Sequence, residues 1–231
     1  MFEQQPETLR QKVRQLSAAA IRRDDPASWF EELYAQARGD YTQVPWAGLT
    51  LHPHAQDWFE HYGFPEEFHD VPRHAVVVGC GLGDDAEALQ NRGFQVTAFD
   101  ISPTAIAWCQ QRFPPSSINY QVADLLCLDS SWHHGFDFVL ECRNLQALPL
   151  SIRATAIQAV GQLVAEQGTL LAIARLRETE AEPDGPPWPL SNQELAQLTT
   201  QGLTEIRRKM FLVGDDPVVK QLWVEYKRER I

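Results

Sequence analysis

From residue 75 onward, short apolar runs alternate with amphipathic stretches, and this alternation predicts strands and helices in turn. The run Ala75-Val76-Val77-Val78 is continuously apolar, which is typical of a strand buried on both faces of a parallel sheet. Five strands are expected, at 75–78, 95–100, 118–123, 136–141 and 168–174. The helices that separate them are expected at 84–91, 103–113 and 151–164. This rhythm predicts an open parallel sheet with right-handed crossovers.

The pattern changes in the last quarter of the chain. A proline-rich loop at 182–189 precedes a helix that is expected at about 191–201. Two long strand-like runs follow, at roughly 203–213 and 218–227, and a short turn joins them. We therefore predict an α/β, Rossmann-like three-layer sandwich with a seven-stranded, mostly parallel sheet and an antiparallel final strand.

The N-terminal part of the chain lacks this alternation. Residues 6–23 form an amphipathic helical pattern, and a second helix at 28–38 starts with a capping-box pattern. A third helix is expected near 53–62. These features predict a helical lid or cap over 1–70, followed by the main domain at 71–231.

Composition narrows the possible functions. There are 20 Lys and Arg residues against 31 Asp and Glu residues, which gives a formal net charge of −11 and disfavours a nucleic-acid partner. The sequence contains no apolar run near the roughly 20 residues that a membrane span needs, and it does not start with a secretory-signal pattern. The scattered cysteines and histidines predict neither a disulfide framework nor a metal site, so we expect a cytoplasmic location.

A glycine-rich turn follows the first predicted strand. Gly79, Gly81 and Gly83 stand at alternate positions between that strand and the next helix. Glycine lets the backbone turn tightly and approach a ligand, and the helix start offers free N–H groups. Such a place suits a dinucleotide pyrophosphate or the carboxylate of an amino-acid-like cofactor.

The acidic pair Asp84 and Asp85 distinguishes these two ligands. Two carboxylates would repel a pyrophosphate, whereas an amino-acid-like ligand also carries an ammonium group. The dinucleotide fingerprint Gly-x-Gly-x-x-Gly would place glycine at position 84. An NAD(P)-dependent oxidoreductase is therefore the less favoured alternative.

Two further acids follow the second and third predicted strands. Asp100 can accept hydrogen bonds from both hydroxyls of a ribose. Asp124 can accept one from an adenine amino group while Leu125 packs on the ring. Ligands of open α/β sheets bind at the carboxyl ends of the strands, where these residues converge.

Together, Gly79–Gly83, Asp100, Asp124 and the antiparallel final strand resemble a class I S-adenosylmethionine-dependent methyltransferase over residues 75–227. The resemblance implies the strand order 3-2-1-4-5-7-6, S-adenosylmethionine as cofactor, and methyl transfer to a small-molecule acceptor by in-line displacement. The cofactor-binding residues that it implies are Gly79, Cys80, Gly81, Gly83, Asp84, Asp100, Ile101, Asp124 and Leu125. The family often has an acid two residues before the first glycine, where this chain has Val77. The methionine ammonium is therefore expected to contact Asp84, a backbone carbonyl or Glu141.

A narrower resemblance is to the thiopurine and halide methyltransferase group, which has a tryptophan-rich N-terminal lid. The segments around Trp29 and Trp46, and the segment 184–188, are similar to it. The resemblance implies that both tryptophans close over the cofactor. Asn144, at the end of the fourth strand, is expected on the substrate side. The Asn/Asp-Pro-Pro-aromatic motif of nucleobase methyltransferases is missing there.

No His-Asp dyad can be placed in the predicted cleft, so no catalytic base is assigned. A soft nucleophile would need none, because proximity and exclusion of water would suffice. The sequence does not specify the acceptor or the oligomeric state. A non-enzymatic interaction module on a methyltransferase fold is a further alternative, disfavoured by the intact glycine turn.

Overall fold

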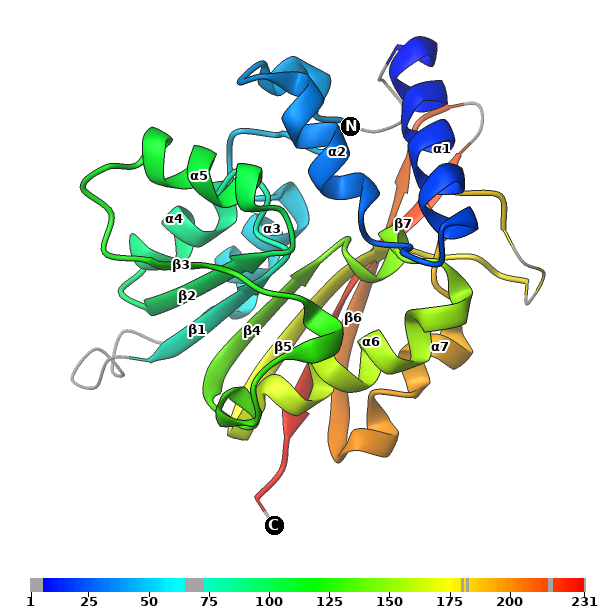
Figure 1. Ribbon diagram of the computed structural model, residues 1–231. Coiled ribbons are helices and arrows are strands. Elements are labelled where there is room, and N and C mark those ends of the chain that lie inside the picture. The colour runs from blue at the N-terminus through cyan, green and yellow to red at the C-terminus, as the bar shows by residue number, and fades with distance from the viewer. Residues whose placement is uncertain (1–5, 65–72, 180, 182, 216–217, 231) are drawn as a thin grey trace.

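The computed structural model describes residues 6–64, 73–179, 181, 183–215 and 218–230, which form one seven-stranded sheet with helices on both faces (Figure 1). The strand order is β3-β2-β1-β4-β5-β7-β6, as the resemblance implied. The strands are β1 (His74–Val78), β2 (Gln95–Asp100), β3 (Asn119–Val122), β4 (Phe136–Cys142), β5 (Val164–Arg175), β6 (Leu203–Val213) and β7 (Val219–Arg228).

Strand direction in the sheet agrees with the prediction. Strands β1 to β5 pair in parallel, and β7 is antiparallel to both of its neighbours, β5 and β6. The chain reverses its strand order at β1, which lies between β2 and β4. A crevice opens at such a switch point, outside the carboxyl ends of the strands.

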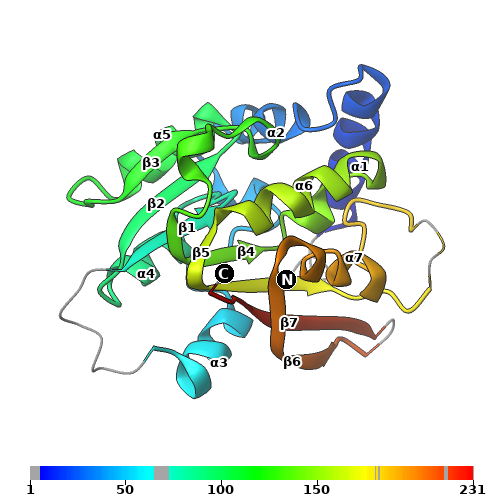
Figure 2. The same ribbon diagram turned by 90° about the horizontal axis from the view of Figure 1, so that it is seen from below.

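The helices form a layer on each face of the sheet, as Figure 2 shows for α3 below it and α6 above it. One core unites α3, α4 and α5 with one side of the strands, and the other unites α6 and α7 with the opposite side. The helices are α3 (Pro53–Tyr62), α4 (Asp84–Gln90), α5 (Pro103–Arg112), α6 (Leu150–Leu163) and α7 (Asn192–Ala196). The three-layer prediction is confirmed.

The continuous apolar run of β1 explains why both faces of the sheet can be covered. Successive side chains of a strand point to opposite faces. Val76 and Val78 accordingly join the core under α6, whereas Ala75 and Val77 join the core under α3 and α4.

Two N-terminal helices, α1 (Glu7–Arg22) and α2 (Trp29–Ala37), lie across the upper edge of the sheet in Figure 1. The Glu31 carboxylate fastens α2 to the start of α5. It accepts hydrogen bonds from the Ser102 hydroxyl at 2.6 Å and from the Thr104 N–H and hydroxyl at 3.1 and 2.6 Å. This attachment brings α2 to the carboxyl end of β2.

In two places the elements differ from those predicted. The strand expected at 168–174 begins at Val164, directly after α6. The helix expected at 191–201 ends at Ala196, and a separate 3-10 turn at Thr199–Gln201 follows, which ends at Gly202 with φ +77°. In β6, most side chains are exposed, including the apolar Ile206, Met210 and Leu212.

The helix expected near 53–62 packs on the sheet itself, through the buried side chain of Trp58. The boundary at residue 70 between a lid and a main domain stays a prediction. Within the described residues, no helix is both long and apolar enough to cross a bilayer.

Candidate functional site

The glycine turn at the end of β1 is shaped by a close approach between Gly79 and Asn144. Gly79 has φ +54°, and a Cβ atom at this position would lie 2.0 Å from Asn144 Oδ1. Asn144 also donates from Nδ2 to the carbonyl oxygens of Val78, at 2.5 Å, and Cys142, at 3.3 Å. Position 79 therefore requires glycine, and the asparagine joins the ends of β1 and β4.

Asp100, the last residue of β2, supports the same turn. Its Oδ2 accepts a hydrogen bond from the Gly81 N–H at 3.0 Å, and its Oδ1 accepts one from the Ser102 N–H at 2.9 Å. The side chain is buried, and this burial raises the pKa of Asp100 to about 6. Each oxygen keeps a second lone pair, so the carboxylate can still accept hydrogen bonds from ribose hydroxyls.

Two cavities open at the carboxyl ends of the strands and meet at four residues that line both of them, namely Phe30, Gly79, Asp100 and Asn144. The smaller cavity is also lined by Ile101, Asp124 and Leu125, three of the residues expected around adenine. The larger cavity is also lined by the predicted residues Trp29, Trp46, Cys80, Gly81 and Asp84. The structure thus brings eleven of the thirteen predicted site residues to two adjacent cavities.

Gly83 and Glu141 are the two predicted residues that line neither cavity. Gly83 has φ +88° and caps α4, and a Cβ there would lie 2.7 Å from the hydroxyl of Tyr120. A glycine at position 83 therefore leaves room for the side chain of Tyr120, which packs against the turn.

Glu141 is fully buried and acts on the backbone. Its Oε1 accepts hydrogen bonds from the N–H groups of Asn144, at 2.7 Å, and Leu145, at 2.9 Å. Desolvation raises its pKa to about 7. Glu141 thus holds the backbone of Asn144 and Leu145, while its Oε2 has no hydrogen-bond partner. Its predicted contact with the methionine ammonium stays a prediction.

Asp84 lines the larger cavity, but its carboxylate already has a partner. Arg112 in α5 binds both of its oxygens, at 2.9 and 2.7 Å, and also donates to the carbonyl of Leu82. The pair ties the glycine turn to α5.

The neighbouring Asp85 has no such cation within 4.0 Å among the described residues. Its Oδ1 accepts the His52 N–H at 2.9 Å, and desolvation by the surrounding protein raises its pKa to about 6. Of the two acids, Asp85 is the one left available to an ammonium group.

Aromatic side chains from α2 and the loop after it cover the glycine turn. Trp29 stacks on Phe30 with ring centroids 4.0 Å apart, and the ring of Trp46 meets both edge-on. The Trp46 indole donates to the hydroxyl of Tyr34 at 2.7 Å, and this hydroxyl lies over Gly81. These rings form one apolar wall of the larger cavity.

Sequence reasoning missed several residues that line the larger cavity, notably Phe30, Tyr34, His52, Asp85 and Arg143. Asp85 was visible beside Asp84, but nothing in the sequence separated their roles. His52 lies 33 residues before Asp85, and no motif spacing connects the two. Within the described residues, no three His, Cys, Asp or Glu side chains are grouped to hold a metal ion.

Residues 75–168 match the family model described as a methyltransferase domain. This segment, 94 of the 231 residues, is similar to a methyltransferase domain. The matched segment contains the glycine turn, Asp100, Asp124 and Asn144. S-adenosylmethionine, the predicted cofactor, is the methyl donor of this class of domain. Among curated proteins, no sequence matches the chain.

Solved structures share the fold over most of the chain. One, from work on the conversion of a disulfide bond into a thioacetal group during echinomycin biosynthesis, has a TM-score of 0.65 at 18% identity and covers 87% of this chain and 93% of its own. The Burkholderia thailandensis 1,6-didemethyltoxoflavin N1-methyltransferase has a TM-score of 0.61 at 20% identity, with coverages of 92% and 89%. The N-methyltransferase NodS of Bradyrhizobium japonicum has a TM-score of 0.56 at 21% identity, with coverages of 68% and 79%. At these identities the likeness establishes the fold alone, an α/β, Rossmann-like fold with a seven-stranded, mostly parallel sheet.

Proposed function

We propose that this protein transfers a methyl group from S-adenosylmethionine to a small-molecule acceptor by in-line displacement. The observation that carries the proposal is the pair of cavities that meet at Gly79, Asp100 and Asn144. One cavity suits a nucleoside and the other suits an amino-acid tail, and a nucleoside with such a tail would span both.

The smaller cavity fits the adenosine part of that cofactor. Asp100, at the junction, would accept hydrogen bonds from the ribose hydroxyls. Asp124 keeps one carboxylate oxygen outside the bond that its Oδ1 accepts from the Leu126 N–H at 2.9 Å. This oxygen would accept a bond from the adenine amino group, while Ile101 and Leu125 would pack against the ring.

The charges at the start of α4 oppose a dinucleotide. Asp84 and Asp85 both line the larger cavity, where a pyrophosphate bound to the glycine turn would lie. The negative carboxylates would repel a negative pyrophosphate bound in the same cavity, and only Asp84 is neutralised by an arginine. The NAD(P)-dependent alternative is therefore not favoured.

The acceptor side of the larger cavity is lined by Val13, Phe30, Trp46, Gln146, Pro186 and Pro187. None of these side chains titrates, so the described part of the chain supplies no general base on this side. It suits a small acceptor that is nucleophilic without one. The Burkholderia thailandensis neighbour, whose structure holds 1,6-didemethyltoxoflavin, is consistent with an acceptor of small size.

When bound, S-adenosylmethionine would supply a methyl group activated by a positive sulfur. The chain's own residues would hold this group in line with the acceptor and exclude water. Asn144, which lines both cavities, would bound the methyl-transfer site on the side of the sheet. The Trp29, Phe30 and Trp46 rings would cover it on the opposite side. Membership in the thiopurine and halide group, inferred from the same lid, stays a prediction.

Calorimetry with S-adenosylhomocysteine tests the cofactor, and mass spectrometry of a panel of thiol, halide, amine and phenol acceptors tests the transfer. We expect saturable binding and a mass increase of one methyl group in at least one acceptor class. Failure to bind S-adenosylhomocysteine, with stabilisation by NAD(H) or NADP(H) instead, would contradict the proposal. Binding without turnover on any acceptor would favour the interaction-module alternative.

A further inference from the structure

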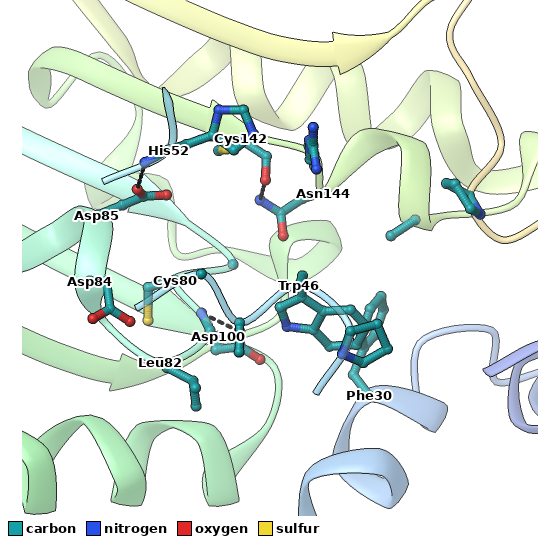
Figure 3. Close-up of a pocket in the computed structure, with 18 of the residues that line it drawn as sticks. Phe30, Trp46, His52, Cys80, Leu82, Asp84, Asp85, Asp100, Cys142 and Asn144 are labelled. Carbon is teal, nitrogen blue, oxygen red and sulfur yellow. Dashed lines mark hydrogen bonds between the residues drawn. The ribbon is translucent and has the colours of Figure 1, made fainter. Parts of the chain in front are cut away.

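Side chains of opposite charge line the end of the larger cavity that lies away from the aromatic roof. Asp85 stands at the start of α4, and Arg143 follows β4. Figure 3 shows Asp85 and His52 on one side of Asn144, with Trp46 and Phe30 on the other. The cavity thus has a charged end, defined by His52, Asp85 and Arg143, and an apolar end.

Arg143 is held in place without a carboxylate partner. Its backbone has φ +68°, an uncommon conformation for a residue with a side chain, and its N–H donates to the Ile173 carbonyl at 2.9 Å. Its Nη2 donates to Gln221 Oε1 at 2.6 Å, and its buried Nε has no hydrogen-bond partner. Among the described residues, no acidic oxygen lies within 4.0 Å of this guanidinium. Backbone strain and an unsatisfied buried donor both point to a ligand.

His52 adds a neutral donor beside Arg143. Its Nδ1 accepts the N–H of His54 at 3.1 Å, at the start of α3. Desolvation, and then the nearby charge of Arg143, lower the pKa of His52 to about 2. The neutral ring therefore carries its hydrogen on Nε2, where it can donate to an anion.

Asp85 supplies the opposite charge. Its Oδ1 accepts the His52 N–H, and the Cys142 thiol is a further hydrogen-bond neighbour of the carboxylate. A carboxylate offers about four lone pairs, so Asp85 can still accept from a ligand. Its neighbour Asp84 is occupied by Arg112, which leaves Asp85 as the acidic group for a cation in this end of the cavity.

We propose that Arg143 and His52 bind the carboxylate of the cofactor's methionine tail and that Asp85 binds its ammonium group. This inference rests on the proposed function, because it assumes a sulfonium nucleoside with an amino-acid tail. The charged end offers a cation, a neutral donor and an anion together, which matches a zwitterion. It also borders the glycine turn, since Cys80, Gly81 and Leu82 line the same cavity.

Calorimetry with three ligands separates the two contacts. S-adenosylhomocysteine carries both tail charges, its decarboxylated analogue 5′-(3-aminopropylthio)adenosine keeps only the ammonium, and 5′-methylthioadenosine has neither. We expect Arg143→Gln to weaken S-adenosylhomocysteine binding about tenfold or more and to leave the other two affinities unchanged. Asp85→Asn should weaken the first two ligands and leave 5′-methylthioadenosine unchanged.

Two matched variants complete the design. Arg143→Lys keeps the charge and should restore part of the affinity for S-adenosylhomocysteine. Arg208→Gln removes an exposed arginine of β6 that bonds Glu205 and Asn192, and it should change no affinity.

The outcomes distinguish this inference from the proposed function. If Arg143→Gln weakens all three ligands equally, or none of them, the assignment of the carboxylate is overturned. The same holds if its effect appears only with an anionic acceptor, since the charge would then serve the acceptor. If the wild-type protein binds none of the three ligands, the proposed function itself fails.

Discussion

The N–H of Gly81 donates to Oδ2 of Asp100 at 3.0 Å, so the glycine turn and the acid at the end of β2 form one hydrogen-bonded unit. A second bond, from the Ser102 N–H to Oδ1, connects this unit to the start of α5. The carboxylate that would bind ribose is thereby also the group that holds the turn. Ligand affinity and the geometry of the turn should depend on the same side chain.

The first prediction concerns Asp100→Asn. The amide keeps one acceptor oxygen and replaces the other with a donor, so it cannot accept from both Gly81 and Ser102. We expect the affinity for S-adenosylhomocysteine, measured by calorimetry, to fall about tenfold or more. Asp129→Asn is the control, because Asp129 is exposed, accepts the Ser131 N–H at 2.8 Å in the same way and lies outside both cavities. Equal affinities for the two variants would exclude Asp100 from the site.

The second prediction concerns the pH dependence of stability through Asp85. The folded-state pKa of about 6 lies above the ordinary value of 3.8, so the folded protein binds this proton more tightly than the unfolded chain does. The contribution of the protonated Asp85 carboxyl to the free energy of unfolding is fully present below about pH 4 and is lost as the pH rises through about 6. Because asparagine has no such proton, Asp85→Asn should gain up to roughly 3 kcal/mol over the wild type between pH 4 and pH 8.

Urea unfolding of both proteins at several pH values measures this difference without ligand. Asp129→Asn is again the control, with the opposite sign expected. Hydrogen bonds from Ser131 lower the pKa of Asp129, so the wild type loses that contribution as the pH falls. A pH-independent difference for Asp85→Asn would show that the carboxyl is not desolvated.

The third prediction concerns the attachment of the lid through Glu31. Burial alone would raise the pKa of this carboxyl, but hydrogen bonds from Ser102 and Thr104 lower it below its ordinary value. In Glu31→Gln, one end of the side chain becomes a donor and loses its acceptor bonds. We expect hydrogen exchange of the α2 amides to become about fivefold to thirtyfold faster, while the sheet amides stay unchanged.

The adjacent Glu32 provides the matched control. Its carboxylate pairs with Arg23 near the surface and does not reach α5. Glu32→Gln should leave the exchange of α2 close to that of the wild type. Acceleration in both variants alike would mean that Glu31 has no special part in holding the lid.

The fourth prediction concerns the pair of Asp84 and Arg112. If it holds the glycine turn rather than the methionine tail, Asp84→Asn should weaken S-adenosylhomocysteine and 5′-methylthioadenosine by the same factor. A double-mutant cycle with Arg112→Gln should show a coupling of about 1 kcal/mol in the free energy of unfolding. A selective loss of S-adenosylhomocysteine in Asp84→Asn would return the ammonium contact to Asp84.

Much of the fold could be predicted because the local pattern and the tertiary structure agree. The run Ala75–Val78 is apolar at every position, and the structure covers it on both faces. The helix after Ser191 was predicted too long, since its apolar pattern continues to Leu198 although the α-helix ends at Ala196 and a 3-10 turn follows. Residue pattern alone does not show where such a turn begins.

The site residues that lie at or just after the ends of strands could be predicted from the sequence. Gly79, Asp100 and Asp124 follow directly from strands, so topology brings them together. Glu141 is the next-to-last residue of β4, but its parity directs the side chain toward the α6 face of the sheet, where it accepts hydrogen bonds from backbone N–H groups. His52 reaches Asp85 only because α3 packs on the sheet, a tertiary contact that no local signal encodes.

The position of β7 between β5 and β6 has a consequence for how the molecule is made. Strand β6 emerges from the ribosome before β7, yet within the described residues β7 is its only partner in the sheet. Until Val219–Arg228 has been synthesised, the backbone of β6 has no sheet neighbour, with Ile206, Met210 and Leu212 already exposed. During translation this edge is open to pairing with other chains, and the charges of Arg207, Arg208 and Lys209 along it oppose such aggregation.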